Sequence, residues 1–266
     1  MKKIIALLLA LCMIAAFAGC AKSDTPATTE APATEATEAA ETTEEVTAPA
    51  EAEGDVMSHA DYMAAELDSP VCIETYVQAH RSWWDNKLTV YAQSEDGAYF
   101  IYNMECSEED AAKLVPGTKI RVNGYKTEWS GEVEIAEGAT FEILEGSYIA
   151  EPQDITGGLG AQNLIDWQNA KISVSGLTVV AANDEGAAFL YNWDGSGAAG
   201  NNNDLYFNVS DGTNTYTFTV ESYLCGEGTD VYTAVTNLNV GDVIDVEGFL
   251  YWYNGAQPHV TSVTVQ

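Results

Sequence analysis

A twelve-residue pattern that occurs twice in this chain sets narrow limits on its fold. The first copy is LVPGTKIRVNGY, residues 114–125, and the second is LNVGDVIDVEGF, residues 238–249. Each copy predicts the end of a helix, a turn at a glycine, and a strand whose apolar residues alternate. A second glycine, Gly124 or Gly248, predicts a bulge or sharp bend in that strand. The flanking sequence also matches, so the chain is predicted to use one small β unit twice.

Each copy predicts three strands, a short helix and two further strands. The helix starts are marked by Ser107 and Thr229, because a hydroxyl before an acidic first turn is a preferred N-cap. Asp-Gly turns join the second and third strands. The predicted elements of the first copy are a helix from Ser58 through Leu67 and strands at 71–78, 88–93, 98–104, 114–125 and 132–144. Those of the second are a short helix at 164–168 and strands at 172–180, 205–209, 215–220, 238–249 and 259–265.

This order of elements is that of the OB-fold, a five-stranded Greek-key barrel with its helix between the third and fourth strands. On this order and the duplicated pattern, the chain resembles a class of bacterial surface lipoproteins with tandem OB-fold domains. The resemblance implies a mainly β protein with barrels over residues 56–148 and 149–266. A pair of β-sandwiches is the alternative, because short strands alone do not separate the two classes.

The N-terminus predicts export. Met1-Lys2-Lys3 precedes an apolar run over residues 4–17 that is too short to span a bilayer and fits a secretory signal. The sequence Phe17-Ala18-Gly19-Cys20 resembles a bacterial lipoprotein signal, which implies that residues 1–19 are removed and Cys20 is lipidated. The predicted location is the outer face of the cell membrane. The alternative is an ordinary signal peptide with an incidental cysteine.

Residues 20–55 predict a disordered tether. Residues 21–54 consist almost entirely of Ala, Thr, Glu and Pro, and Val46 is their only large aliphatic side chain. Such a segment cannot bury enough apolar surface to offset the entropy lost on ordering. Fully extended, it would reach on the order of 110 Å from the membrane.

The charge of the chain disfavours nucleic acid as a partner. It holds 41 acidic and 10 basic residues, and beyond residue 55 the balance is 31 acidic to seven basic. Lys171 is the only basic residue of the second copy. Phosphate backbones are bound by Lys and Arg that displace counterions, so this surface should repel them.

The sequence predicts no enzyme, cofactor or metal site. It contains no G-x-S-x-G, P-loop or HExxH motif and no Cys-x-x-Cys pair. The three cysteines beyond the tether, Cys72, Cys106 and Cys225, are an odd number and are interpreted as core or turn residues. The segment 194–204 is dense in oxygen ligands and raises the question of calcium, but it lacks EF-hand spacing.

The predicted binding sites lie in the loops that flank the usual OB-fold ligand face. These loops carry aromatic residues in both copies, and flat rings stack on bases or sugar faces. The alternative is that the rings plug the barrel ends. The predicted function is a monomeric, non-catalytic binding module for an envelope glycan, peptide or protein. Single-stranded nucleic acid is the alternative, since the basic residues Arg81 and Lys87 flank the first tryptophan pair. The candidate residues are Arg81, Trp83, Trp84, Lys87 and Trp129 in the first copy, and Trp193, Trp252 and Tyr253 in the second.

Overall fold

The computed structural model describes residues 55–266. The predicted signal peptide, the lipidation site Cys20 and nearly all of the predicted tether lie outside these residues. The described chain folds into two β-barrels, which are called barrel 1 and barrel 2 and belong to one compact unit. Among the described residues, no helix has the length and apolar character needed to cross a bilayer.

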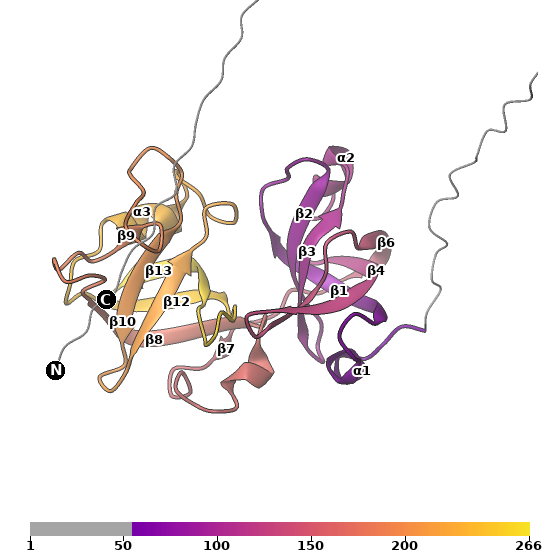
Figure 1. Cartoon of the computed structure of the whole chain (residues 1–266), viewed down its shortest axis with the longest axis horizontal. Helices are drawn as coiled ribbons and strands as arrows, with labels where there is room; N and C mark the ends of the chain where they lie inside the picture. The colour runs from indigo at the N-terminus through magenta and orange to yellow at the C-terminus, as the bar shows by residue number, and fades with distance from the viewer. Residues whose placement is uncertain (1–54) are drawn as a thin grey trace, which may run out of the picture. The chain divides into compact units, whose positions relative to one another are not determined.

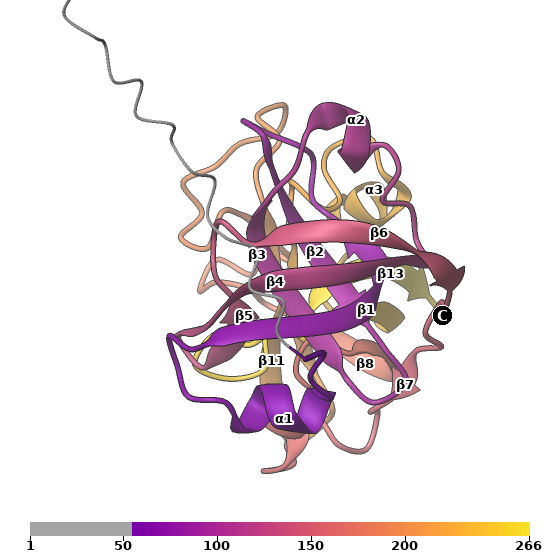
Figure 2. The ribbon, with the colours of Figure 1, turned by 90° about the vertical axis from the view of Figure 1, so that its right-hand side faces the viewer.

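Barrel 1 closes a sheet on itself. Its hydrogen-bonded order is β1-β2-β3-β5-β4-β6, and a further pairing of β1 with β4 completes the barrel. Figure 2 shows β6, β4 and β1 side by side, as the antiparallel pairings require. The strands are β1 (Pro70–His80), β2 (Lys87–Gln93), β3 (Ala98–Glu105), β4 (Thr118–Trp129), β5 (Glu132–Ile135) and β6 (Thr140–Ser147).

Barrel 2 closes in the same way (Figure 1). Its order is β7-β8-β12-β13-β11-β10-β9, and β8 also pairs with β10. The strands are β7 (Gln153–Asp154), β8 (Lys171–Val180), β9 (Leu190–Tyr191), β10 (Leu205–Ser210), β11 (Thr215–Val220), β12 (Val243–Phe249) and β13 (His259–Val265).

The two barrels share one topology, which confirms the predicted OB-fold. In each, the third strand runs parallel to the fifth: Phe100 of β3 pairs with Glu134 of β5, and Thr219 of β11 pairs with His259 of β13. The remaining pairings within the barrels are antiparallel, apart from the short β7 beside β8. A sandwich of two separate sheets would not close on itself, so the alternative architecture does not apply.

The helices begin where the sequence predicts. Ser107 accepts a hydrogen bond from the Asp110 amide at the start of α2 (Glu108–Ala111), and Thr229 accepts one from the Tyr232 amide at the start of α3 (Asp230–Thr236). These two helices join the third and fourth strands of their barrels. The other helices are α1 (His59–Ala64) and the 3₁₀ helix η1 (Leu164–Trp167).

The helix α1 is shorter than its prediction, which extended to Leu67. Its C-cap Ala65 has extended backbone angles. The Lys126 ammonium donates to the carbonyl oxygens of Met63 and Ala65 at 2.7 and 2.8 Å. A buried side chain therefore satisfies these terminal carbonyls, which otherwise lack intrahelical partners.

The duplicated glycines perform the predicted roles, with one difference. Gly117 and Gly241 turn the chain into β4 and β12 with φ of +93° and +100°, a region that glycine enters without strain. Gly248 sits at a register shift between β12 and β13, and a Cβ there would lie 2.3 Å from the His259 carbonyl oxygen. Gly124 keeps regular register with β1, and its missing side chain instead makes room for Ile135.

Candidate ligand-binding cleft

The outer face of β2 and β3, where OB-folds usually bind ligands, is covered by barrel 2. Tyr91 and Phe100 project from this face and are fully buried together with Phe249 of barrel 2. The Tyr91 and Phe249 rings stack with centroids 4.6 Å apart, and Phe100 meets Tyr251 edge-on at 5.4 Å. Barrel 1 therefore uses its usual ligand face to hold barrel 2.

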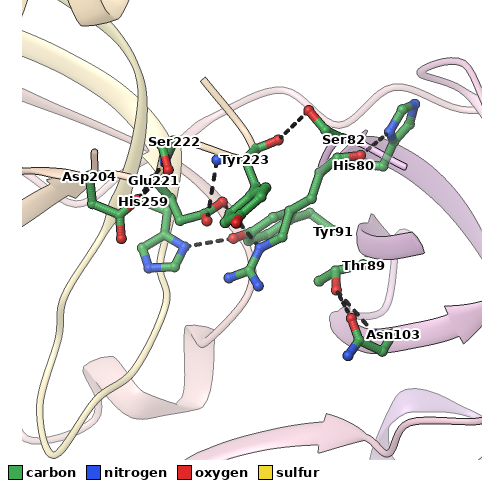
Figure 3. Close-up of polar contacts among 11 residues, drawn as sticks. His80, Ser82, Thr89, Tyr91, Asn103, Asp204, Glu221, Ser222, Tyr223 and His259 are labelled. Carbon is green, nitrogen blue, oxygen red and sulfur yellow. Dashed lines mark hydrogen bonds and ion pairs between the residues drawn. The ribbon is translucent and has the colours of Figure 1, made fainter. Parts of the chain in front are cut away.

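A buried hydrogen bond lies at the edge of this interface. The Tyr91 hydroxyl lies 2.6 Å from His259 Nδ1 (Figure 3). Burial lowers the pKa of His259 to about 3, so the imidazole is neutral at physiological pH. The hydroxyl donates to Nδ1 in one tautomer of the neutral ring and accepts from it in the other.

The corresponding face of barrel 2 is open. On β10 the burial alternates along the strand, so Leu205, Phe207 and Val209 enter the core while the residues between them face outward. Among these, Tyr206 lies opposite Thr219 of β11, and Asn208 lies opposite Thr217. These four outward side chains form the floor of a cleft, Tyr206, Asn208, Thr217 and Thr219.

The cleft has a volume of about 790 Å³, within the range of about 300–1,000 Å³ of small-ligand sites. One wall is the loop between β8 and β10, and another is the loop between β12 and β13. Trp129 and Arg81 of barrel 1 also line the cleft. Its aromatic lining consists of Trp129, Trp193, Tyr206, Tyr223, Tyr251 and Tyr253.

An ion pair crosses between the barrels inside the cleft. Arg81 Nε lies 3.1 Å from Glu221 Oε2, and the guanidinium lies 5.6 Å from the centroid of the Phe100 ring. Burial raises the pKa of Glu221, and the charge of Arg81 opposes that rise. Beside this pair, the amide of Ser82 donates to the Tyr223 carbonyl oxygen at 2.6 Å.

A second buried carboxyl supports the loop between β12 and β13 from behind. Glu132 of β5 is fully buried, and its Oε2 accepts a hydrogen bond of 2.8 Å from the Trp252 amide. Its Oε1 has no hydrogen-bond partner in the described part of the chain, and neither has the buried Oδ1 of Asn169. Burial raises the pKa of Glu132 to about 8. A protonated Glu132 keeps the Trp252 bond without placing a charge in the interface.

Four of the eight sequence-predicted binding residues line the cleft. These are Arg81, Trp129, Trp193 and Tyr253, and they come from both barrels. The indoles of Trp129 and Trp193 are 60% and 75% exposed, so their faces are open to a ligand. The structure thus brings together rings that the sequence had placed in two separate sites.

The other four predicted residues lie elsewhere. The indole N–H of Trp83 donates to the Cys106 carbonyl oxygen at 2.8 Å, and the ring packs on the core of barrel 1. Trp252 packs on the core of barrel 2. Trp84 is 67% exposed but does not line the cleft, and Lys87 pairs with Glu137.

The sequence analysis did not identify two groups of residues that line the cleft. These are the outward side chains of β10 and β11, which form its floor, and three polar residues beside that floor. The signal for the floor was present, because LYFNVS and TYTFTV each place polar residues on one face of a strand. The three polar residues that line the cleft beside the floor share no motif and are far apart in sequence. They are Asp204, Glu221 and His259.

Several side-chain oxygens of the loop from Asp194 to Asp204 accept hydrogen bonds from backbone amides. Asp194 accepts from the Ser196 amide, Asn203 accepts from the Ala198 amide, and Asn202 accepts from the Glu227 amide. No cluster of His, Cys, Asp and Glu able to hold a metal occurs between residues 55 and 266. Within the same range the three cysteines are free thiols.

No protein-family model and no curated protein matches the chain. Distant likeness to solved structures exists. One is the crystal structure of the tetrameric p202 HIN2, at 15% identity and a TM-score of 0.33, which covers 76% of this chain and 96% of that one. Another is a murine DNA binding protein bound with ds DNA, at 13% identity, a TM-score of 0.33, and coverage of 73% and 94%.

A third is a replication protein A heterotrimer bound to ssDNA, at 9% identity and a TM-score of 0.32, which covers 74% of this chain and 49% of that one. At these scores the likeness carries no argument about a ligand. The fold assignment rests on the strand order of the chain itself.

The two adjacent tryptophans of barrel 1 should respond differently to replacement. We expect Trp83→Ala to lower the free energy of unfolding by about 3 kcal/mol or more, because it removes a packed ring and leaves the Cys106 carbonyl without its donor. Trp84→Ala should change it by less than about 0.5 kcal/mol. Urea unfolding of both variants measures this. Equal loss in the two variants would contradict the placement of Trp83 in the core.

The buried carboxyls predict that stability falls between pH 6.5 and 8. The pKa values of Glu132 and Glu134 are raised to about 8 and about 7, so the folded state keeps protons that the unfolded chain, with values near 4.5, has lost. Each carboxyl with a raised pKa lowers the free energy of unfolding by up to about 1.4 kcal/mol per pH unit as the pH rises towards its pKa in the folded state. The lowered pKa values of His59 and His259 act only below 6.5, outside this window.

Glu132→Gln tests this dependence, since glutamine keeps an oxygen for the Trp252 amide and cannot ionise. The variant should unfold with a shallower pH slope over this window and be more stable than the native protein at pH 8. Glu145→Gln is the matched control, because Glu145 is exposed on β6 and forms no hydrogen bond or ion pair among the described residues. An unchanged slope in Glu132→Gln would show that Glu132 does not titrate as described.

Proposed function

We propose that this protein is a non-catalytic binding module that takes a glycan of the cell envelope in the cleft on the outer face of β10 and β11. The observation that carries the proposal is the composition of the cleft. Open aromatic faces stand on its walls, and neutral hydrogen-bonding side chains form its floor. Sugar rings present an apolar face and a ring of hydroxyls, so they need both features.

Hydrogen-bonding capacity in the cleft supports a polar ligand. The hydroxyl of Thr219 is buried and has no hydrogen-bond partner within residues 55–266. The Nε2 of His259 forms no hydrogen bond among the described residues, although its ring is held in place through Nδ1. Buried polar groups without partners are costly, and a hydroxylated ligand would satisfy them.

The charge of the cleft argues against nucleic acid. It contains the carboxylates of Asp204 and Glu221 and a single cation, Arg81, which pairs with Glu221. Arg81 comes from barrel 1, and the only Lys or Arg in the sequence of barrel 2 is Lys171. A phosphate backbone would find no cation free of a carboxylate there.

The N-terminal sequence supports the second part of the proposal, a lipid anchor on Cys20 that holds the module at the outer face of the membrane. A short basic start, an apolar run and a cysteine after small residues precede a segment that cannot form a core. Such a tether would let the cleft reach envelope material at a distance from the bilayer.

The ligand class can be tested on the purified Cys20→Ser protein with a panel of neutral oligosaccharides, wall fragments and oligonucleotides. We expect an oligosaccharide to bind with affinity that changes little between about 50 and 200 mM salt, whereas phosphate-dependent binding falls steeply over that range. Trp193→Ala and Trp129→Ala should each weaken binding about tenfold without lowering the melting temperature, a loss of about 1.4 kcal/mol.

Trp167→Ala is the control for these variants, because Trp167 is an exposed indole outside the cleft. Binding that is lost equally in all three variants would not come from the cleft. Tight, salt-sensitive binding of oligonucleotides alone would replace the glycan with nucleic acid as the ligand.

Anchoring is tested separately by cell fractionation. The native protein should sediment with membranes, and Cys20→Ser should appear in the soluble exported fraction, because the variant lacks the side chain that would carry the lipid. Retention of Cys20→Ser in the membrane fraction would show that the signal is not that of a lipoprotein.

A further inference from the structure

The carboxylate of Asp204 lines the cleft and has one oxygen that accepts no hydrogen bond from the described residues. Its Oδ1 accepts hydrogen bonds from the Ser222 amide at 2.8 Å and from the Ser222 hydroxyl at 2.7 Å. Figure 3 shows both contacts on one oxygen, with the second oxygen turned away from them. No described residue donates to Oδ2, and Asp204 takes part in no ion pair of the described chain. A rigidly held acceptor with a full negative charge therefore lines the cleft.

The surroundings do not neutralise this charge. Arg81 is the only cation that lines the cleft among the described residues, and Glu221 lies 3.1 Å from its Nε. Lys171, the only base of barrel 2, directs its ammonium to the Ala150 carbonyl oxygen. The second copy holds 14 acidic residues against that one lysine. A cleft walled by apolar rings concentrates such a field and attracts cations.

The aromatic lining adds to the attraction. Six aromatic side chains line the same cleft as Asp204, and a cation placed over the face of Trp or Tyr gains about 0.5–2 kcal/mol. The exposed indole of Trp193 belongs to the loop before β10, and the phenol of Tyr223 belongs to the loop that follows β11. A cationic group bound near Asp204 therefore meets both a carboxylate and aromatic faces.

From this arrangement we propose that the cleft selects a sugar that carries a free primary amine. The proposal rests on the glycan-binding function and names its ligand class. Asp204 Oδ2 can accept from a hydroxyl or an N–H group, but a charged N–H donor forms the stronger bond, and a primary ammonium has such a donor whereas a quaternary ammonium lacks one. The floor residues Asn208, Thr217 and Thr219 then take the hydroxyls of the same sugar, and the walls take its apolar face. A de-N-acetylated hexosamine meets all three requirements.

Two tetrasaccharides that differ only in the nitrogen substituent test the proposal. Tetra-glucosamine and tetra-N-acetylglucosamine are titrated calorimetrically into the Cys20→Ser protein at about pH 5, because the neighbouring oxygens and the repulsion between like charges lower the pKa values of the four free amines. We expect the amine form to bind at least about tenfold more tightly. Asp204→Asn should remove that advantage, because asparagine keeps an oxygen for Ser222 but replaces the free carboxylate oxygen with an uncharged NH2 group that accepts no hydrogen bond.

The matched control for the variant is Glu247→Gln. Glu247 is an exposed carboxylate on β12 of the same barrel and lies outside the cleft, so its loss changes the net charge equally. It should leave both affinities unchanged. Tetralysine is the control for general attraction to an acidic surface, and it should bind weakly and without dependence on Asp204.

The outcomes separate this proposal from the glycan function. Equal affinity for the two tetrasaccharides overturns the amine selectivity and leaves glycan binding standing. Binding of neither overturns the selectivity as well, and the wider oligosaccharide panel then decides on the function independently. Equal loss in Asp204→Asn and Glu247→Gln, or tight binding of tetralysine, would show that surface charge alone is responsible.

Discussion

The structure depends on the burial of one face of barrel 1 against barrel 2. Tyr91 lies at the centre of this contact, fully buried between Phe100 and Phe249. A buried phenol is most stable with a hydrogen-bond partner, and the partner of Tyr91 is His259 at the start of β13. This bond and the stacking of the imidazole on the Tyr251 ring, with centroids 4.2 Å apart, hold the first residue of β13 in place, and that residue lines the cleft.

The same contact gives the two copies different roles. In barrel 1 the strands β2 and β3 are buried on both faces, whereas β10 and β11 of barrel 2 bury one face and leave most of the other open. Barrel 1 then adds Arg81 and Trp129 to the open cleft of its neighbour. The two copies therefore share one topology but differ in which strand face is covered and which is open.

Local sequence signals were sufficient for the fold. The caps Ser107 and Thr229 and the turn glycines Gly117 and Gly241 act within a few residues, so their effect can be recognised without knowledge of the tertiary structure. The candidate site was only partly predictable. The sequence pointed to the aromatic residues Trp129 and Trp193 as candidates, but it put Trp129 in a loop, whereas it ends β4, and it assigned the two residues to different sites. Nothing local states which barrel face is covered.

The covered face also limits how this architecture can change over evolutionary time. A chain reduced to barrel 1 alone would expose the rings of Tyr91, Phe100 and Tyr102 as a contiguous apolar patch, which is a liability for aggregation. A chain reduced to barrel 2 alone would lose Arg81 and one wall of the cleft. Barrel 1 buries a strand face against barrel 2, and barrel 2 takes part of its cleft lining from barrel 1, so removal of either copy would change the surface of the other.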